Sequence, residues 1–175
     1  MTVQGSVAIE GNTLNEEQIS AVMDGNRVVG PRREILEVQN AILAYDRLHE
    51  WRPERRSDLL KAHNILMARL LETAGHWRRL TVGVVQGAAV VHVAPPADRV
   101  SFLVQMLLSF FAKETQTHPL IKAAMVHYEL GFIHPFEDGN GRIGRLWYSL
   151  LLSRYHSLFP YVPIESMIRD RQQDY

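Results

Sequence analysis

Apolar residues recur at spacings of three and four along most of the chain, which is the period of an amphipathic helix. The proline at residue 31 favours a helix start, because its missing N–H would be unpaired in the first turn anyway. Gly75 offers a stop for a second helix. The period predicts long helices over residues 31–51, 57–73, 97–113, 119–132 and 141–155.

One stretch, residues 81–94, breaks this period. It is rich in valine, carries Gln86-Gly87 near its middle and is closed by Pro95-Pro96. Short β-branched runs around a glycine predict a β-hairpin, and the two prolines prevent its continuation. A lone hairpin is only marginally stable and has open edges, so we expect it to lean on the helices. The expected fold is mainly α with a small β-hairpin.

Both ends of the chain are also predicted to be helical. Thr13-Leu-Asn-Glu16 predicts a capping box for a helix that runs to about Met23. Ser6-Val-Ala-Ile-Glu-Gly11 predicts a short helical turn that ends at its glycine. Residues 163–175 carry a helical pattern that stops in mid-helix, as expected of a piece cut from a longer protein.

Composition narrows the class of protein. A chain of 175 residues suits one domain, over 1–175, whose core needs no disulfide or structural metal. The absence of cysteine fits a reducing cytoplasm. Because 19 basic residues balance 19 acidic ones, charge gives no reason to expect nucleic acid or an anionic membrane as a partner. There is no membrane-length apolar run and no signal peptide, so we expect a soluble cytoplasmic protein.

The run His134-Pro-Phe-Glu-Asp-Gly-Asn-Gly-Arg-Ile-Gly-Arg145 combines features of a phosphate site. The proline after His134 disfavours helix at that histidine, which is therefore expected where a helix ends and a loop begins. Gly139-Asn-Gly141 predicts a tight turn whose N–H groups, with the positive end of the next helix, can bind an anion. Arg142 and Arg145 are three apart and share one face of that helix.

Two further side chains of this run suggest a reaction. Asp138 is a hard oxygen ligand beside the phosphate site, which suits Mg²⁺ shared with a nucleotide. His134 is a base whose ordinary pKa lies near neutrality. Base, metal ligand, anion site and arginines together describe transfer of a phosphorus group to a hydroxyl. A P-loop is excluded, because Gly-x-x-x-x-Gly-Lys-Ser/Thr does not occur.

The same run resembles the signature of the Fic family, His-x-Phe-x-Asp/Glu-Gly-Asn-Gly-Arg-x-x-Arg, at every specified position. The surroundings are similar too, with a helix on each side and a preceding hairpin closed by a Pro-Pro pair. The resemblance covers residues 6 to about 175. It implies a Fic-type helical domain that transfers AMP from ATP to a Ser, Thr or Tyr of a target protein, with pyrophosphate leaving. It also implies Mg²⁺, with Mn²⁺ as an alternative.

The resemblance implies a role for each part of the run 134–145, the catalytic loop and helix start. His134 would be the general base that deprotonates the target hydroxyl, and Asp138 would hold Mg²⁺ between the α- and β-phosphates. The hairpin would be a flap that binds a target segment by strand pairing. The other implied roles are α-phosphate contact for Asn140, backbone amides from Gly139 and Gly141, the β- and γ-phosphates for Arg142 and Arg145, and a core anchor for Phe136.

A second match lies near the N-terminus, where Ser6-Val-Ala-Ile-Glu-Gly11 resembles the family's inhibitory motif Ser/Thr-x-x-x-Glu-Gly/Asn. By this resemblance residues 1–25 would be an inhibitory segment that contains Ser6 and Glu10. Glu10 would pair with Arg145 in a bidentate way and take the guanidinium meant for the γ-phosphate. ATP could still enter, but its α-phosphate would be turned from productive attack.

The sequence leaves other functions open. The same site could transfer UMP or a phosphate group, or could remove AMP with Glu10 orienting a water. The chain could also be a non-catalytic, nucleotide-gated regulatory module, and a homodimer is open because relatives often pair. Outside the motifs, Arg78-Arg79 is interpreted as solvated charge, and His63 shows no spacing typical of a zinc ligand.

Overall fold

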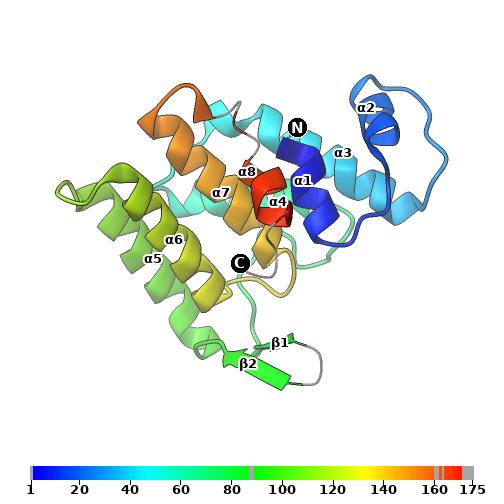
Figure 1. Ribbon diagram of the computed structural model, residues 1–175. Helices are drawn as coiled ribbons and strands as arrows, with labels where there is room; N and C mark the ends of the chain where they lie inside the picture. The colour runs from blue at the N-terminus through cyan, green and yellow to red at the C-terminus, as the bar shows by residue number, and fades with distance from the viewer. Residues whose placement is uncertain (1, 87–88, 160–161, 163, 171–175) are drawn as a thin grey trace.

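The computed structural model describes residues 2–86, 89–159, 162 and 164–170 (Figure 1). The mainly α fold expected from the sequence is confirmed. Within these residues no helix is long and apolar enough to cross a lipid bilayer. The elements are α1 Thr2–Ile9, α2 Glu16–Met23, α3 Arg32–Asp46, the 3-10 turn η1 Leu48–Glu50, α4 Arg56–Leu66, β1 Gly83–Gln86, β2 Ala89–Val93, α5 Ala97–Lys113, α6 Pro119–Ile133, α7 Asn140–Tyr155 and α8 Ile164–Asp170.

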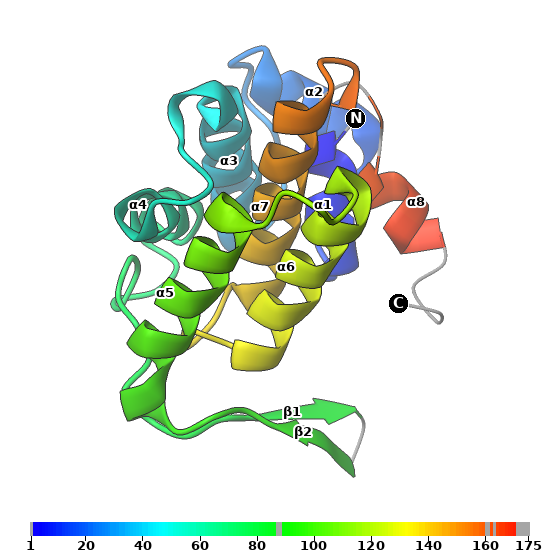
Figure 2. The same cartoon turned by 90° about the vertical axis from the view of Figure 1, so that its left-hand side faces the viewer.

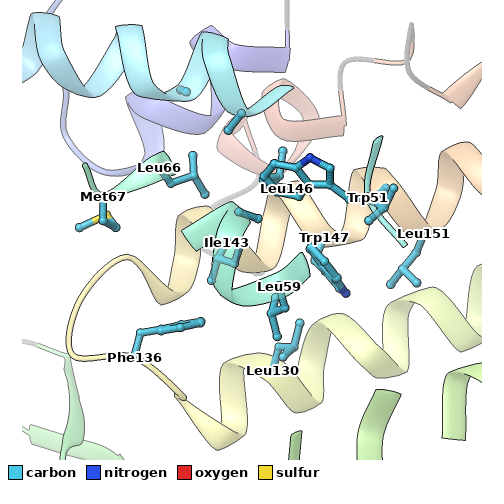
Figure 3. Packing of buried hydrophobic residues seen from close by; sticks show 14 of the residues in the cluster. Trp51, Leu59, Leu66, Met67, Leu130, Phe136, Ile143, Leu146, Trp147 and Leu151 are labelled. Carbon is cyan, nitrogen blue, oxygen red and sulfur yellow. The ribbon is translucent and has the colours of Figure 1, made fainter. Parts of the chain in front are cut away.

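The core is built around α7, which contacts α6, α4, α1 and η1. Its residues are buried on nearly every side, so it lacks the polar face of a surface helix. Figure 3 shows Ile143 and Trp147 of α7 packed with Leu59 of α4 and Leu130 of α6. The indole N–H of Trp147 donates to the carbonyl of Pro53 at 3.2 Å, which satisfies its one polar group. The first turn of this buried helix carries the predicted site.

Helix α4 ends earlier than predicted, at residue 66 rather than 73. The cause is a tertiary contact: the Asn40 amide of α3 donates to the carbonyls of Leu66, at 3.2 Å, and Ala68, at 2.8 Å. These carbonyls would bond within the helix if it continued. Arg69 then takes a positive φ of 62°, which turns the chain away. Helix α3 is likewise shorter than predicted and is followed by η1, whereas α5, α6 and α7 match their predicted bounds to within one residue.

The capping box of α2 is shifted by two residues from the predicted one. Asn15 is the N-cap, with its side chain accepting from the N–H of Gln18 at 2.9 Å, and the Gln18 side chain accepts in return from the N–H of Asn15. Both pairs fit the sequence rule, since asparagine caps a helix as well as threonine does. Thr13 instead donates to Glu34 of α3 through its N–H at 2.6 Å and its hydroxyl at 2.8 Å.

The hairpin pairs β1 with β2 in antiparallel fashion, with a register shift between Val84 and Val85. The turn residues 87 and 88 lie outside the described residues. Figure 2 shows the hairpin projecting beyond the ends of α5 and α6, attached at its base, rather than leaning along the helices as expected. Its edges are therefore presented away from the helical core.

The two ends of the chain meet where α1 packs against α8, as Figure 1 shows in blue and red. The contact is close: a Cβ on Gly5 would lie 2.6 Å from the backbone nitrogen of Ser166. Only glycine permits this approach of two backbones. The predicted C-terminal helix is present over Ile164–Asp170, and residues 163 and 171–175 of that prediction lie outside the described residues.

We expect Gly5→Ala to lower the free energy of unfolding by on the order of 1–3 kcal/mol, because the new methyl meets backbone that cannot rotate away. Urea denaturation followed by circular dichroism measures this. The matched control is Gly131→Ala on α6, where nothing lies within 4 Å of the added methyl. That change should stabilise by about 0.5–1 kcal/mol, since alanine is the better helix former. Equal effects at both glycines would contradict the close packing of α1 on α8.

Candidate active site

The predicted catalytic run forms the turn between α6 and α7, and both ends of the turn have left-handed backbone. His134, the C-cap of α6, has φ 49° and ψ 61°. For a residue with a Cβ this conformation costs about 1–2 kcal/mol. Gly139, the N-cap of α7, has φ 77°, and a Cβ there would lie 2.6 Å from the sulfur of Met67. The turn is therefore tight and needs support from its neighbours.

Inside the turn, Phe136 and Asn140 hold the backbone. Phe136 is completely buried, as expected of a core anchor. The Asn140 side chain accepts from the N–H of Phe136 at 2.9 Å and donates to its carbonyl at 2.8 Å. One N–H of the Asn140 amide is used in closing the turn, so its second N–H and its backbone N–H at the start of α7 are not used there. The α-phosphate contact that the resemblance implies for Asn140 stays a prediction.

His63 of α4 packs against the turn and binds its backbone, a role that the sequence did not predict. Its ring stacks on Phe136 with centroids 3.6 Å apart and planes 6° apart. Nδ1 accepts from the N–H of Gly75 at 2.9 Å, which assigns the proton to Nε2, and Nε2 lies 2.9 Å from the carbonyl of Asp138. Burial lowers the pKa of His63 from 6.5 to about 4. The imidazole is therefore neutral, as both hydrogen bonds require.

Arg142 is buried and lies between two carboxylates. Its Nη1 pairs with Glu37 of α3, and its Nη2 lies 3.4 Å from Asp138. Glu37 also accepts from the Asn12 side chain at 3.0 Å, so it joins the N-terminal segment to the site. No sequence pattern indicated Glu37, because its contact with Arg142 spans 105 positions of the chain. The Asp138 side chain is 49% exposed and accepts from the N–H of Gly139 at 2.6 Å.

Arg145, which is 3% exposed, contacts the N-terminal helix. Its Nη2 lies 2.5 Å from Oε1 of Glu10 and donates to the carbonyl of Ser6 at 3.1 Å, while Nε donates to the Ser6 hydroxyl at 3.3 Å. The fork is thus shared between Ser6 and one oxygen of Glu10, in place of the expected bidentate pair. A Cβ on Gly141 would lie 2.6 Å from that oxygen. Glycine at this position therefore lets the carboxylate reach α7.

Arg78 was expected to be solvated, and this is wrong: it is 4% exposed. Removal from water lowers the pKa of its guanidinium. The neighbouring arginine of the pair is exposed, so the two are not alike. No periodicity in the sequence distinguishes them. The guanidinium of Arg78 donates to the main-chain carbonyls of His134 at 2.7 Å, Leu80 at 2.8 Å, Pro95 at 2.5 Å and Ile133 at 3.2 Å.

Comparison with known proteins agrees with this geometry. Residues 53–152 match the model of the Fic/DOC family. The chain belongs to the Fic/DOC family. Helices α4 to α7, the hairpin and the catalytic turn lie within or close to the matched residues, whereas α1, with Ser6 and Glu10, lies before them.

Relatives extend the similarity to the ends of this Fic/DOC chain. The protein adenylyltransferase Fic of Culex quinquefasciatus is 30% identical over 181 residues, which cover 97% of this chain and 35% of that protein. The crystal structure of a Fic family protein from Desulfovibrio desulfuricans G20 has a TM-score of 0.93 and 49% identity, over 99% of this chain and 53% of that one. Fic-1 of C. elegans has a TM-score of 0.76 and 28% identity, over 88% and 47%. The chain thus spans about a third to a half of the length of these relatives.

The residues of this Fic/DOC site form two groups of contacts at the start of α7. One joins Arg142 to Asp138 and Glu37, and the other joins Arg145 to Ser6 and Glu10. In the described part of the chain, no cluster of three or more His, Cys, Asp or Glu could hold a metal ion by itself. Asp138 nevertheless fits Mg²⁺, which in nucleotide sites takes one or two carboxylates and completes its shell with phosphate oxygens and water.

The neutral His63 predicts a dependence of stability on pH. Its folded pKa, about 4, lies below the unfolded value of 6.5, so the unfolded chain binds the extra proton between these values. The contribution of the neutral His63 to the free energy of unfolding is therefore fully present above pH 6.5. It is lost as the pH falls to about 4, by about 3 kcal/mol in total. Urea denaturation at several pH values, for wild type and His63→Gln, measures this. The variant should lose the part of the slope that His63 contributes, whereas the part from His127, whose pKa is also lowered by burial, should remain. An unchanged slope would contradict the assignment.

Proposed function

We propose that this Fic/DOC domain transfers AMP from Mg-ATP to a Ser, Thr or Tyr hydroxyl of a target protein, and that Glu10 restrains the transfer. The observation that carries the proposal is the contact of Glu10, directly after α1, with Arg145 of α7, Oε1 to Nη2 at 2.5 Å. This contact connects the motif Ser6–Gly11, which resembles the family's inhibitory motif, to an arginine of the proposed phosphate site. The name of the Culex relative, a protein adenylyltransferase, supports the same reaction class.

The start of α7 supports the binding of a triphosphate. The first N–H groups of a helix have no partner within the helix, and the helix dipole attracts negative charge there. Two arginines with little exposure, Arg142 and Arg145, add charge in fork geometry suited to phosphate oxygens. Asp138, half exposed beside them, would hold Mg²⁺, which would supply positive charge to offset that of the phosphates.

His134 would act as the general base. It stands at the end of α6, across the turn from Gly139 at the start of α7, and its side chain is half-buried. Its imidazole would take the proton of the target hydroxyl as the hydroxyl oxygen bonds to the α-phosphorus. The bond from that phosphorus to the bridging oxygen breaks, and pyrophosphate leaves with the electron pair. The products are AMP-modified protein, pyrophosphate and a protonated His134 that returns its proton to water.

The hairpin would dock the target. A sheet of β1 and β2 alone leaves strand edges for an added strand, and it projects from the helices on the side of the His134 turn (Figure 2). Main-chain pairing reads the backbone of the target more than its side chains. Residues 1–175 would then act as one unit, with an inhibitory segment over 1–25, a flap over 81–94 and a catalytic turn over 134–145. A cytoplasmic location and a homodimer stay predictions.

The restraint by Glu10 has a simple electrostatic basis. A carboxylate and a γ-phosphate both bind a guanidinium through oxygen, so they compete for Arg145. Because Glu10 is on the same chain, it is always present at the site, and the γ-phosphate would have to displace it from Arg145 before ATP could take its productive position. Removal of AMP is the second candidate function, since the Glu10 side chain is 27% exposed and could orient a water at the phosphate end.

We expect Glu10→Gly to raise the labelling of protein in a cell lysate from α-labelled ATP by about ten- to a hundredfold. A hydrogen bond to a charged group is worth about 1.5–3 kcal/mol, and this competition with the phosphate is lost. Adding His134→Ala to the Glu10→Gly chain should abolish the labelling. Glu17→Gln on α2, an exposed carboxylate near Glu10 in sequence, is the matched control and should leave the rate unchanged.

The position of the label separates the alternatives. Label from the α- but not the γ-phosphate is expected for AMP transfer, and label from the γ-phosphate alone would indicate a phosphate transfer instead. Release of AMP from modified protein, lost in Glu10→Gln, would favour the second candidate. Absence of α-label in Glu10→Gly, with ATP still bound, would leave a nucleotide-gated module and contradict the proposed transfer.

A further inference from the structure

Arg78 is a buried cation outside the run of residues 134–145. In the part of the chain that the structure describes, no carboxylate lies within ion-pair distance of its guanidinium. Such a group is costly to bury unless its N–H donors are all used. Here the donors go to main-chain carbonyls instead of to an acid. The buried guanidinium therefore holds main-chain segments together through their carbonyls.

The carbonyls around Arg78 come from three segments that meet at the base of the hairpin. One segment is the end of α6, where Nε donates to His134 and Nη2 to Ile133. The other two are the strands' connections to the helical core: Nη1 donates to Leu80, before β1, and Nη2 also donates to Pro95, after β2. A single planar group therefore joins both legs of the hairpin to the residue proposed as the base.

The main chain of the same residue strengthens this junction. The N–H of Arg78 donates to the carbonyl of Pro135 at 3.0 Å, so Arg78 binds the carbonyls of the two peptide units that flank Pro135. The hairpin base is closed by the N–H of Ala94, which donates to Val82 at 3.1 Å. His134 has φ 49°, and this left-handed conformation sets the direction in which its imidazole leaves the backbone. Holding the His134 carbonyl therefore holds the Cα–Cβ direction from which the imidazole projects.

We propose that Arg78 is a positioning residue, which fixes the imidazole of His134 relative to the hairpin and so relative to the hydroxyl that the hairpin presents. This rests on the proposed function of the site and goes beyond it, because Arg78 touches neither nucleotide groups nor the inhibitory helix. Arg78 would affect the rate through the position of His134 and not through contact with the reacting groups. A base displaced by about 1 Å can lose on the order of a hundredfold in rate.

Lysine cannot replace Arg78 in this role. Arginine offers five N–H donors fixed in one plane, which lets Nε, Nη1 and Nη2 point at different carbonyls at the same time. Lysine has the same charge on a single nitrogen. A lysine keeps the positive charge, but its one nitrogen cannot donate to carbonyls of all three separated segments. Arg78→Lys therefore separates the fork geometry from the charge.

The test compares Arg78→Lys and Arg78→Met in the Glu10→Gly chain, with Arg79→Met at the exposed neighbour as control. At saturating ATP, both Arg78 variants should lower kcat for α-labelling of lysate protein by about ten- to a hundredfold. The KM for ATP should stay within about twofold, because the groups proposed for phosphate are on α7. Hydrogen exchange should rise together in the hairpin and in the peptide with His134. The Arg79 variant should change none of these.

A second readout needs no turnover. The imidazole of His134, followed by NMR in wild type and Arg78→Lys, should show changed ring chemical shifts if its orientation depends on Arg78. If Glu10→Gly shows no labelling at all, the proposed function fails, and NMR with hydrogen exchange still decides the role of Arg78. A lower melting temperature with unchanged kcat per folded molecule and unchanged His134 resonances would overturn the proposal. Unfolding of both Arg78 variants would also overturn it, since Arg78 would then be a residue of the fold.

Discussion

Two buried arginines at the start of α7 constrain much of the molecule around them. Arg142 is 7% and Arg145 is 3% exposed, and a guanidinium removed from water needs well-aligned acceptors, among which carboxylates also offset its charge. The chain supplies these from distant segments, with Glu37 on α3 and Glu10 at the end of α1. The placement of α1 and α3 against α7 therefore serves electrostatics as well as the apolar core. The same burial suits the arginines to phosphate, since charge-assisted hydrogen bonds gain strength where water is excluded.

The position of Glu10 depends in turn on α8. Helix α1 is held by backbone contact at Gly5 and by a polar network beneath it, in which Glu165 of α8 accepts from Ser149 of α7 at 2.6 Å and from Tyr45 of α3 at 2.9 Å. Burial raises the pKa of Glu165. The network thus joins α3, α7 and α8 around α1, the helix that Glu10 directly follows. The position of Glu10 beside Arg145 therefore depends on how α1 packs against α8, and the proposed restraint of the site would depend on the same packing.

The sequence predicted what is local and missed what is long-range. The bounds of α5, α6 and α7 follow from apolar period, proline and glycine, all read within one segment. The end of α4 was misplaced because Asn40, 26 positions away, takes its last carbonyl. His63 and Arg78 were missed because their partners lie 75 and 56 positions away in the turn that they support. A contiguous motif identifies the groups for chemistry, but nothing in it names the residues that hold those groups.

These supporting residues explain how the turn can keep a strained shape. The left-handed backbone of His134 costs conformational energy, and Gly139 lies so close to Met67 that a side chain there would clash. Three sets of contacts act against relaxation: Asn140 binds Phe136 from inside the turn, His63 binds the Asp138 carbonyl from α4, and Arg78 binds the His134 carbonyl from the hairpin side. Because they come from separate elements, no single helix movement releases all three. These contacts therefore hold His134 and the start of α7 in a fixed relation, whereas Glu10 reaches the same place from the separate segment that follows α1.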